Sequence, residues 1–207
     1  MKKILCFGDS NTYGFNPENG SRFDEKTRWT GLIKSELKNK FEVIEAGVNN
    51  RCAFSKNPEG ENLIGLIAIE KYLVKKPDIV ILAIGINDLQ KIYNNDKNAI
   101  YEGIKALIQK IKSANNPDIV LLIPSFIKEN ILKSFFNCLF DETSIEKSKF
   151  LPEIYEKLAD EFKIFSLDLN KITETSEFDG LHYSKEGHKK IADSILSFLS
   201  AKNLTNF

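Results

Sequence analysis

The stretch DIVILAIG (residues 78–85) decides the fold, because its middle is an unbroken apolar run with no polar residue at alternate positions. A strand of this kind is buried on both faces, which is typical of a parallel sheet between two layers of helices. The stretch DIVLLIP (residues 118–124) has the same character. The sequence therefore predicts an α/β fold around a buried, mainly parallel sheet.

Strands and helices alternate outward from these two stretches. Three more strands are expected at 3–7, 41–46 and 163–169, which gives a five-stranded sheet in a three-layer sandwich. The length of 207 residues fits one domain over 1–207. Six helices are expected, at 29–39, 62–76, 98–112, 126–140, 150–162 and 184–200. The helix over 126–140 should be amphipathic, with an apolar stripe formed by Ile131, Phe135 and Leu139.

Composition argues against several classes of protein. The 29 basic and 29 acidic residues cancel, so a nucleic-acid-binding surface is not expected and a small substrate is favoured. No segment approaches the ~20 apolar residues of a membrane span, and the first apolar run is too short for a signal peptide, so we expect a cytoplasmic protein. Cys6, Cys52 and Cys138 form no CxxC pair, which disfavours a disulfide framework or a zinc site.

Four short polar motifs stand where chemistry is expected. GDSN (8–11), AGVNNR (46–51) and GIND (85–88) follow the first three strands, and DGLH (179–182) precedes the last helix. In open α/β sheets, ligands bind beyond the carboxyl ends of the strands. We therefore expect all four motifs on one rim of the sheet.

The motifs contain the groups that an acyl-transfer site needs. Asp179 lies three residues before His182, a spacing that lets its carboxylate orient the imidazole ring. The other ring nitrogen can then accept the proton of the Ser10 hydroxyl, which makes Ser10 a candidate nucleophile. Asn87 offers a neutral hydrogen-bond donor for developing negative charge. These residues predict a catalytic serine site.

In the order and spacing of these motifs, the chain resembles the SGNH (GDSL-type) hydrolases. The resemblance implies a flavodoxin-like sandwich, serine esterase chemistry and no cofactor or metal. It makes Ser10 the nucleophile and Asp179 with His182 the rest of the triad. The oxyanion hole would be formed by Ser10, Asn50 and Asn87.

One position departs from the family pattern. Asn50 stands where the family usually has a glycine that donates its backbone N–H, a role that asparagine can keep although its side chain changes the pocket. Residues 22–51 also resemble the branch of bacterial arylesterase/acyltransferases and acetyl xylan esterases. That branch implies short-chain, acetyl-type ester substrates, with acyl transfer to other acceptors as a further activity.

Other residues have less specific interpretations. Asn11, Trp29 and Arg51 are candidate substrate-binding residues, although Trp29 and Arg51 could equally be packing residues. Asp9 and Asp88 are interpreted as structural partners of loop backbone, and His188 as a residue on the surface or at the start of the last helix. The apolar stripe of 126–140 packs on the body, or leaves a surface for a substrate lid or a second subunit in a homo-oligomer.

Three rival functions remain. A lysophospholipase or thioesterase of the same family would use the same catalytic residues. A flavodoxin-like cofactor-binding module would leave DGLH unexplained, and the phosphate motifs GxxxxGK[ST] and GxGxxG are absent. A metal-dependent phosphoesterase could use Asp9, Asp88, Asp179 and His182, but Ser10 and Asn87 would then have no role.

Overall fold

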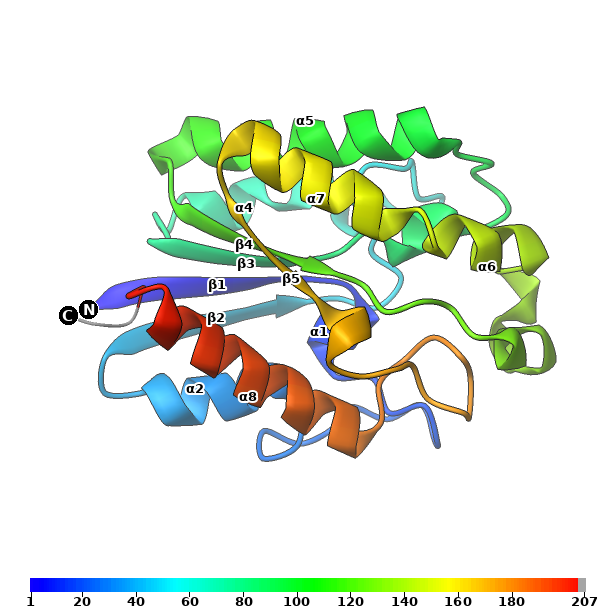
Figure 1. Cartoon of the computed structure of the whole chain (residues 1–207), viewed down its shortest axis with the longest axis horizontal. Helices are drawn as coiled ribbons and strands as arrows, with labels where there is room; N and C mark the ends of the chain where they lie inside the picture. Colours follow the sequence, from blue (N-terminus) through cyan, green and yellow to red (C-terminus); the bar gives the residue numbers. More distant parts are fainter. Residues whose placement is uncertain (205–207) are drawn as a thin grey trace.

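The computed structural model describes residues 1–204 and is built around a five-stranded sheet in which every strand pair is parallel (Figure 1). The strand order is β2-β1-β3-β4-β5. This arrangement confirms the predicted parallel α/β sandwich. The strands are β1 (Lys2–Gly8), β2 (Phe41–Gly47), β3 (Ile79–Ala83), β4 (Asp118–Ile123) and β5 (Phe165–Asp168).

Helices cover both faces of this sheet. Figure 1 shows α2 (Trp29–Leu37) and α8 (Lys185–Ala201) on one face, and α5 (Lys97–Asn115) with α7 (Leu151–Phe162) on the other. The remaining α-helices are short: α1 (Ser10–Tyr13), α3 (Gly65–Ala68), α4 (Glu70–Leu73) and α6 (Glu142–Ser148). Within residues 1–204, five 3-10 turns complete the elements: η1 (Glu61–Leu63), η2 (Ile86–Leu89), η3 (Glu129–Lys133), η4 (Phe135–Cys138) and η5 (Leu169–Lys171).

Strands β1 to β4 each contribute side chains to two separate cores, as β1 illustrates. Leu5 and Phe7 pack into the core under α5 and α7. Ile4 and Cys6 point the other way and pack into the core under α2 and α8. Successive side chains of a strand alternate between the faces of the sheet. Both faces are buried at β1, β3 and β4, which is why these strands contain continuous apolar runs.

The first three strands end level with one another, and this forms the rim on which the polar motifs meet. Gly8 pairs with Gly47 of β2 and with Ala83 of β3. A Cβ on Gly8 would lie 2.1 Å from the Ala83 carbonyl oxygen, so only glycine fits there. The turn after β1 can therefore pack closely against the end of β3.

The predicted helix over 126–140 is wrong. The chain forms two 3-10 turns, η3 and η4, separated by Ser134 in an extended conformation. The Ser134 hydroxyl accepts a hydrogen bond from the Phe136 N–H at 3.1 Å and so begins the second turn. Ile131 is completely buried, whereas Phe135 is 85% exposed. The i, i+4 spacing of apolar residues therefore does not form a stripe.

The predicted helix over 62–76 is interrupted. Ile64 has extended backbone angles and separates the turn η1 from α3. The cause is a bridge to the loop after β2: the Gly65 N–H donates to the Cys52 carbonyl oxygen at 2.7 Å, and the Cys52 N–H donates to Leu63. Tertiary hydrogen bonds here replace those of a continuous helix.

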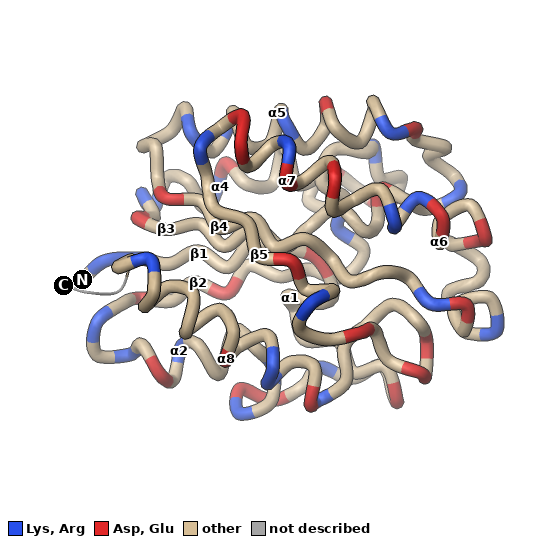
Figure 2. The backbone as a smooth tube through the Cα atoms, viewed as in Figure 1, with Lys and Arg blue, Asp and Glu red and all other residues tan. Residues whose placement is uncertain are grey.

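Charged residues of both signs are mixed along the helices in Figure 2. The chain carries 29 basic and 29 acidic residues, and the long helices α5, α7 and α8 each carry both signs. Of the helices within residues 1–204, none combines the length and the apolar character needed to cross a lipid bilayer.

Candidate active site

The turn after β1 presents Ser10 at the start of a very short helix. Asp9 caps this helix, because its carboxylate accepts the Asn11 N–H at 2.9 Å. Burial raises the pKa of Asp9 to about 7, although the Asn11 N–H and the charge of Arg51 favour the ionised form. Gly14, at φ 89°, ends the helix. The Ser10 hydroxyl is thereby fixed at the carboxyl end of β1.

Ser10, His182 and Asp179 form a continuous hydrogen-bonded chain. The Ser10 Oγ lies 2.8 Å from His182 Nε2, and His182 Nδ1 lies 2.6 Å from Asp179 Oδ2. An ionised carboxylate can only accept, so Nδ1 carries the hydrogen and Nε2 accepts from the serine hydroxyl. This is the arrangement in which a histidine can act as base toward a serine.

The backbone fixes the Asp179 carboxylate in place. Its Oδ1 accepts the N–H groups of Leu181 and His182, each at 2.9 Å. Burial opposes ionisation of Asp179, but the hydrogen bond and charge of His182, together with these two N–H groups, lower its pKa below the ordinary value. The three-residue spacing of DGLH thus brings the carboxylate and the ring together within one tight turn.

Asn11 connects the serine turn to the loop that carries His182. Its Nδ2 donates to the Leu181 carbonyl oxygen, and its Oδ1 accepts the Tyr183 N–H, each at 3.2 Å. Trp29 is almost completely buried and donates through Nε1 to the Asn11 carbonyl oxygen at 3.0 Å. Asn11 and Trp29, both expected to contact substrate, are therefore engaged within the protein in this structure.

Asn50 occupies a left-handed turn beyond β2, at φ 60°. Asparagine tolerates this conformation better than most residues, which explains how it can replace a glycine. The Asn50 carbonyl oxygen accepts a hydrogen bond from Asn57 Nδ2 at 2.9 Å. Within residues 1–204, neither the Asn50 N–H nor the Ser10 N–H donates a hydrogen bond. Both are therefore available to a ligand.

Asn87 stands in the turn η2 beyond β3. Gly85 begins this turn at φ 118°, and a Cβ there would lie 2.1 Å from the Tyr155 hydroxyl. Asn87 Nδ2 donates to the Arg51 carbonyl oxygen at 3.0 Å, and its Oδ1 accepts from Gln90 Nε2 at 3.1 Å. One of the two Nδ2 hydrogens therefore remains for a ligand. Asn87 is buried, so water competes little for its side-chain hydrogen bonds.

Arg51, a candidate substrate-binding residue, is 0% exposed and faces the interior. Its Nη1 donates to the carbonyl oxygens of Gly8 at 3.0 Å and Ala46 at 2.6 Å. The guanidinium also lies over the Phe7 ring, 4.5 Å from its centre. In this structure Arg51 is therefore engaged within the protein, where it donates to carbonyl groups at the ends of β1 and β2.

Two acidic residues beside the motifs serve the backbone, as predicted. The Asp88 carboxylate accepts the N–H groups of Ala53, Phe54 and Ser55 at 2.6 to 3.1 Å. Asp9 caps α1 in the same manner. Over residues 1–204, no group of three or more His, Cys, Asp or Glu side chains is arranged to hold a metal ion.

His188 lies at the start of α8, one of the two positions expected for it, but it is completely buried rather than on the surface. Its Nδ1 accepts the Trp29 N–H at 3.4 Å, and its ring packs edge-on against Phe23. Burial lowers the pKa of His188 to about 3, so the ring stays neutral.

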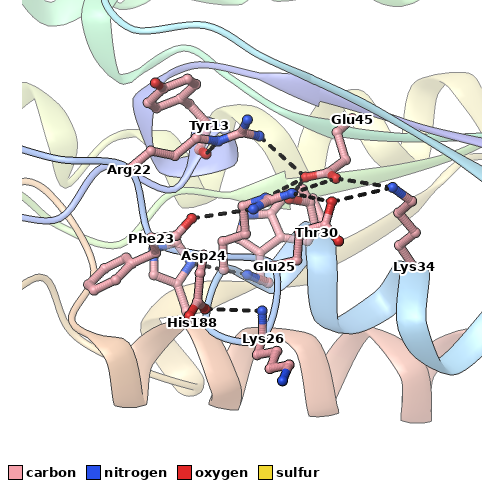
Figure 3. A network of polar contacts seen from close by, with 12 residues as sticks. Tyr13, Arg22, Phe23, Asp24, Glu25, Lys26, Thr30, Lys34, Glu45 and His188 are labelled. Atoms are coloured by element: carbon pink, nitrogen blue, oxygen red, sulfur yellow. Dashed lines mark hydrogen bonds and ion pairs between the residues drawn. The ribbon is translucent and has the colours of Figure 1, made fainter.

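Two aromatic residues beside the histidine were not predicted from the sequence as part of the site. The Phe15 and Phe136 rings lie 4.3 and 5.1 Å from the His182 ring, measured between ring centres. Phe15 begins the loop before α2, which is anchored to β2 through Glu45 (Figure 3). Phe136 belongs to η4 and is only partly buried. No local sequence pattern points to either ring: Phe15 follows Ser10 by five residues but meets His182 only through the fold, and Phe136 comes from a segment far from all four motifs.

Comparison with known proteins agrees with this geometry. The family model described as GDSL-like Lipase/Acylhydrolase matches residues 4–195. The chain resembles the native aryl esterase of M. smegmatis at a TM-score of 0.88 and 26% identity, covering 97% of this chain and 99% of that one. The same values hold for Est24, a carbohydrate acetylesterase from Sinorhizobium meliloti. No curated protein sequence is significantly similar.

Proposed function

Because this chain belongs to the GDSL-like lipase/acylhydrolase family of carboxylic ester hydrolases, we propose that it cleaves short-chain esters through an acyl-enzyme on Ser10. The observation that carries the proposal is the chain of hydrogen bonds from Ser10 through His182 to Asp179, at 2.8 and 2.6 Å. A buried serine hydroxyl that donates to a carboxylate-oriented imidazole is an activated nucleophile.

In the first half of the reaction, Ser10 Oγ attacks the ester carbonyl carbon and His182 Nε2 takes the hydroxyl proton. Negative charge then develops on the carbonyl oxygen. The backbone N–H groups of Ser10 and Asn50 and the remaining Nδ2 hydrogen of Asn87 are the donors for this oxyanion. When the tetrahedral intermediate collapses, the leaving alcohol takes the proton from Nε2 and the acyl group stays on Ser10.

In the second half, His182 Nε2 takes a proton from water, and the resulting oxygen nucleophile attacks the acyl carbon. The same three donors hold the second oxyanion. Collapse returns the proton to Ser10 Oγ and releases the carboxylic acid. Asp179, ionised throughout, stabilises the imidazolium formed in each half.

The substrate class is inferred from the surroundings of His182. The leaving alcohol must lie next to Nε2, where Phe15 and Phe136 provide flat apolar surface. Such surface suits an aromatic alcohol or the apolar face of a sugar. The two similar structures described above are an aryl esterase and a carbohydrate acetylesterase, which supports a small acetyl-type acyl group.

We propose acyl transfer as a second outcome of the same intermediate. An alcohol that occupies the aromatic surface beside His182 can replace water as the nucleophile, because the base and the oxyanion donors are unchanged. With nitrophenyl acetate and added benzyl alcohol, we expect benzyl acetate to form in addition to acetate. Acetate as the sole product at every alcohol concentration would contradict this proposal.

Reaction with a serine-directed fluorophosphonate, followed by identification of the labelled peptide, tests the nucleophile. We expect label on Ser10 and none on the Ser10→Ala variant, which should keep its fold and lose hydrolysis of nitrophenyl acetate. Label on a different serine would overturn the mechanism. A yellow protein with tightly bound flavin would instead favour a cofactor-binding module.

The length of the acyl chain separates the esterase from its nearest rival. Across nitrophenyl esters from acetate to decanoate, we expect kcat/KM to be highest for acetate or propionate. A steady rise toward the longer chains would favour a lysophospholipase or thioesterase, which would use the same catalytic residues on a different substrate.

A further inference from the structure

Gln90 links the two asparagines of the proposed oxyanion hole. Its Nε2 donates one hydrogen bond to Asn50 Oδ1 at 2.8 Å and another to Asn87 Oδ1 at 3.1 Å. The side chain is only 3% exposed, and its backbone N–H also donates to the Asn87 carbonyl oxygen at the end of η2. The buried amino group of Gln90 therefore donates both of its hydrogens, one to each of two residues from different motifs.

This link determines which way the Asn87 amide faces. An asparagine amide can rotate by 180°, which exchanges its oxygen and its nitrogen. In the observed orientation, Oδ1 accepts from Gln90 and Nδ2 donates to the Arg51 carbonyl oxygen. The rotated amide would set donor against donor at Gln90 and acceptor against acceptor at Arg51. Gln90 thus favours the orientation that leaves an Nδ2 hydrogen for the substrate.

The same link explains the asparagine at position 50. A glycine would fit the left-handed turn equally well, at φ 60°. Asparagine adds an acceptor, Oδ1, by which Gln90 restrains the loop beyond β2. Asn57 restrains the same residue from the other side, through the Asn50 carbonyl oxygen. The backbone N–H of Asn50 is consequently held in a loop that is tied at two points.

We propose that Gln90 is a positioning residue that orients both oxyanion donors, Asn50 and Asn87. The proposal rests on the proposed function, because it assumes that these two residues stabilise an oxyanion. Among the hydrogen bonds within residues 1–204, none joins Gln90 to Ser10 or His182. Its effect should therefore appear in the transition state and not in binding of the ground-state ester.

Gln90→Met removes both hydrogen bonds and keeps the length of the side chain. We expect kcat to fall by roughly 10- to 100-fold, because small misplacements of catalytic groups have effects of this size. KM should change by less than about threefold. Affinity for an aryl trifluoromethyl ketone, which forms a tetrahedral adduct with the serine, should fall by the same factor as kcat/KM. The pH midpoint of kcat should not move, because the His182–Asp179 pair is untouched.

Three further variants make the comparison specific. Gln109→Met changes the other glutamine, which is exposed on α5, and should match the wild type. Gln90→Glu keeps the shape but turns a carboxylate oxygen toward two carbonyl oxygens, so it should be at least as impaired as Gln90→Met. In an Asn50→Gly background, Gln90→Met should lower kcat by a smaller factor than it does in the wild type, because one of the two hydrogen-bond partners of Gln90 is already absent.

The outcomes separate this proposal from the proposed function. A wild type that is inactive on nitrophenyl acetate and is not labelled at Ser10 overturns both. A wild type that is active and labelled, with folded Gln90→Met and Gln90→Glu variants of unchanged kcat, overturns the role of Gln90 alone. A Gln90→Met variant that raises KM without lowering kcat, and that binds the ketone as tightly as the wild type does, also overturns the role of Gln90. Folding is checked for each variant by its Tm.

Discussion

At the scale of single residues, Asn50 and Asn87 are proposed to stabilise the same oxyanion with different atoms. Asn87 acts through its side chain, so Asn87→Ala deletes the donor. We expect kcat on nitrophenyl acetate to fall by about 10²–10³, the usual effect of losing one oxyanion-hole donor. Steady-state kinetics measure this loss, and circular dichroism confirms that the variant is folded.

Asn50→Gly is the comparison for Asn87→Ala, because it removes the asparagine side chain and keeps the backbone donor. The backbone N–H and the φ of 60° are kept, while the bond to Gln90 is lost. We expect kcat to fall by less than about tenfold, with a change in preference among alcohols as the pocket widens. If Asn50→Gly were more damaged than Asn87→Ala, the Asn50 side chain would itself take part in catalysis, contrary to the proposed oxyanion hole.

Asp179→Asn tests the orientation of His182. An amide in place of the carboxylate can donate to Nδ1, which favours the ring tautomer with its hydrogen on Nε2. That nitrogen then cannot accept the Ser10 proton, so we expect kcat to fall by up to about 10⁴ with KM little changed. A variant that keeps wild-type kcat would show that the 2.6 Å contact to Nδ1 is not needed for catalysis.

The sequence was sufficient to place Ser10, His182 and Asp179, and it was not sufficient for Gln90, Phe15 and Phe136. Ser10 belongs to a short motif at the end of β1, and Asp179 and His182 share a short motif just before α8, so local sequence marks all three. Gln90 lies three residues after Asn87, but its partner Asn50 is 40 residues away. Such contacts depend on how two loops pack together beyond the strand ends. Residue spacing along the chain does not predict that packing.

At the scale of elements, the loop before α2 is anchored by a partly buried charge on β2. Glu45 accepts hydrogen bonds from Arg28 Nε at 2.6 Å, Arg28 Nη2 at 2.8 Å and Thr30 Oγ1 at 2.6 Å. Figure 3 shows Arg22 and Lys34 also turned toward this carboxylate. The loop carries Phe15 to His182, so Glu45 supports the active site from a distance.

The Glu45 network predicts a pH-dependent contribution to stability. Burial alone would raise the pKa of Glu45, but the bonds from Arg28 and Thr30 lower it to about 2. A carboxylate whose pKa is lower in the folded state than in the unfolded state stabilises the folded protein. This contribution is complete at pH values above the unfolded-state pKa of about 4.5, and it is lost as pH falls toward 2. Glu45→Gln should lower Tm at pH 7 by roughly 3–6 °C, equivalent to about 1–2 kcal/mol for a partly solvated pair.

The difference in Tm between wild type and Glu45→Gln should shrink as pH falls from about 4.5 toward 2. Glu42→Gln is the control, because Glu42 lies on the same strand with its side chain exposed. This control should match the wild type at every pH. A Glu45→Gln difference that is constant across the acid range would show that the network acts by packing and not by charge.

Strands and long helices were predictable from the sequence, whereas the connections were not. The apolar runs of β3 and β4 and the faces of α5 and α8 are set by burial, and burial is visible in local hydrophobicity. The segments 62–76 and 126–140 also have helical spacing, but a bridge to Cys52 interrupts the first and a cap at Ser134 divides the second. Tertiary hydrogen bonds overrode local preference in both.

At the scale of the whole molecule, the parallel sheet brings four separated motifs to one rim. Gly8, Gly47 and Ala83 lie in register, so the loops beyond them start from the same level. The chain as a whole carries no net charge, with 29 basic and 29 acidic residues. Copies of the chain therefore repel one another weakly, a condition that favours association at high concentration.

The last prediction is that the chain self-associates through residues 126–140. Phe135 is 85% exposed in this segment, and its ring packs edge-on against Phe136, which in turn lies beside His182. A second copy would cover this apolar ring. By sedimentation equilibrium, we expect a dimer whose dissociation constant rises at least tenfold in Phe135→Ser. Val74→Ser is the control, because Val74 is 77% exposed and lies just after α4. Only monomer at millimolar concentration would contradict the prediction, as would equal weakening of association by both variants.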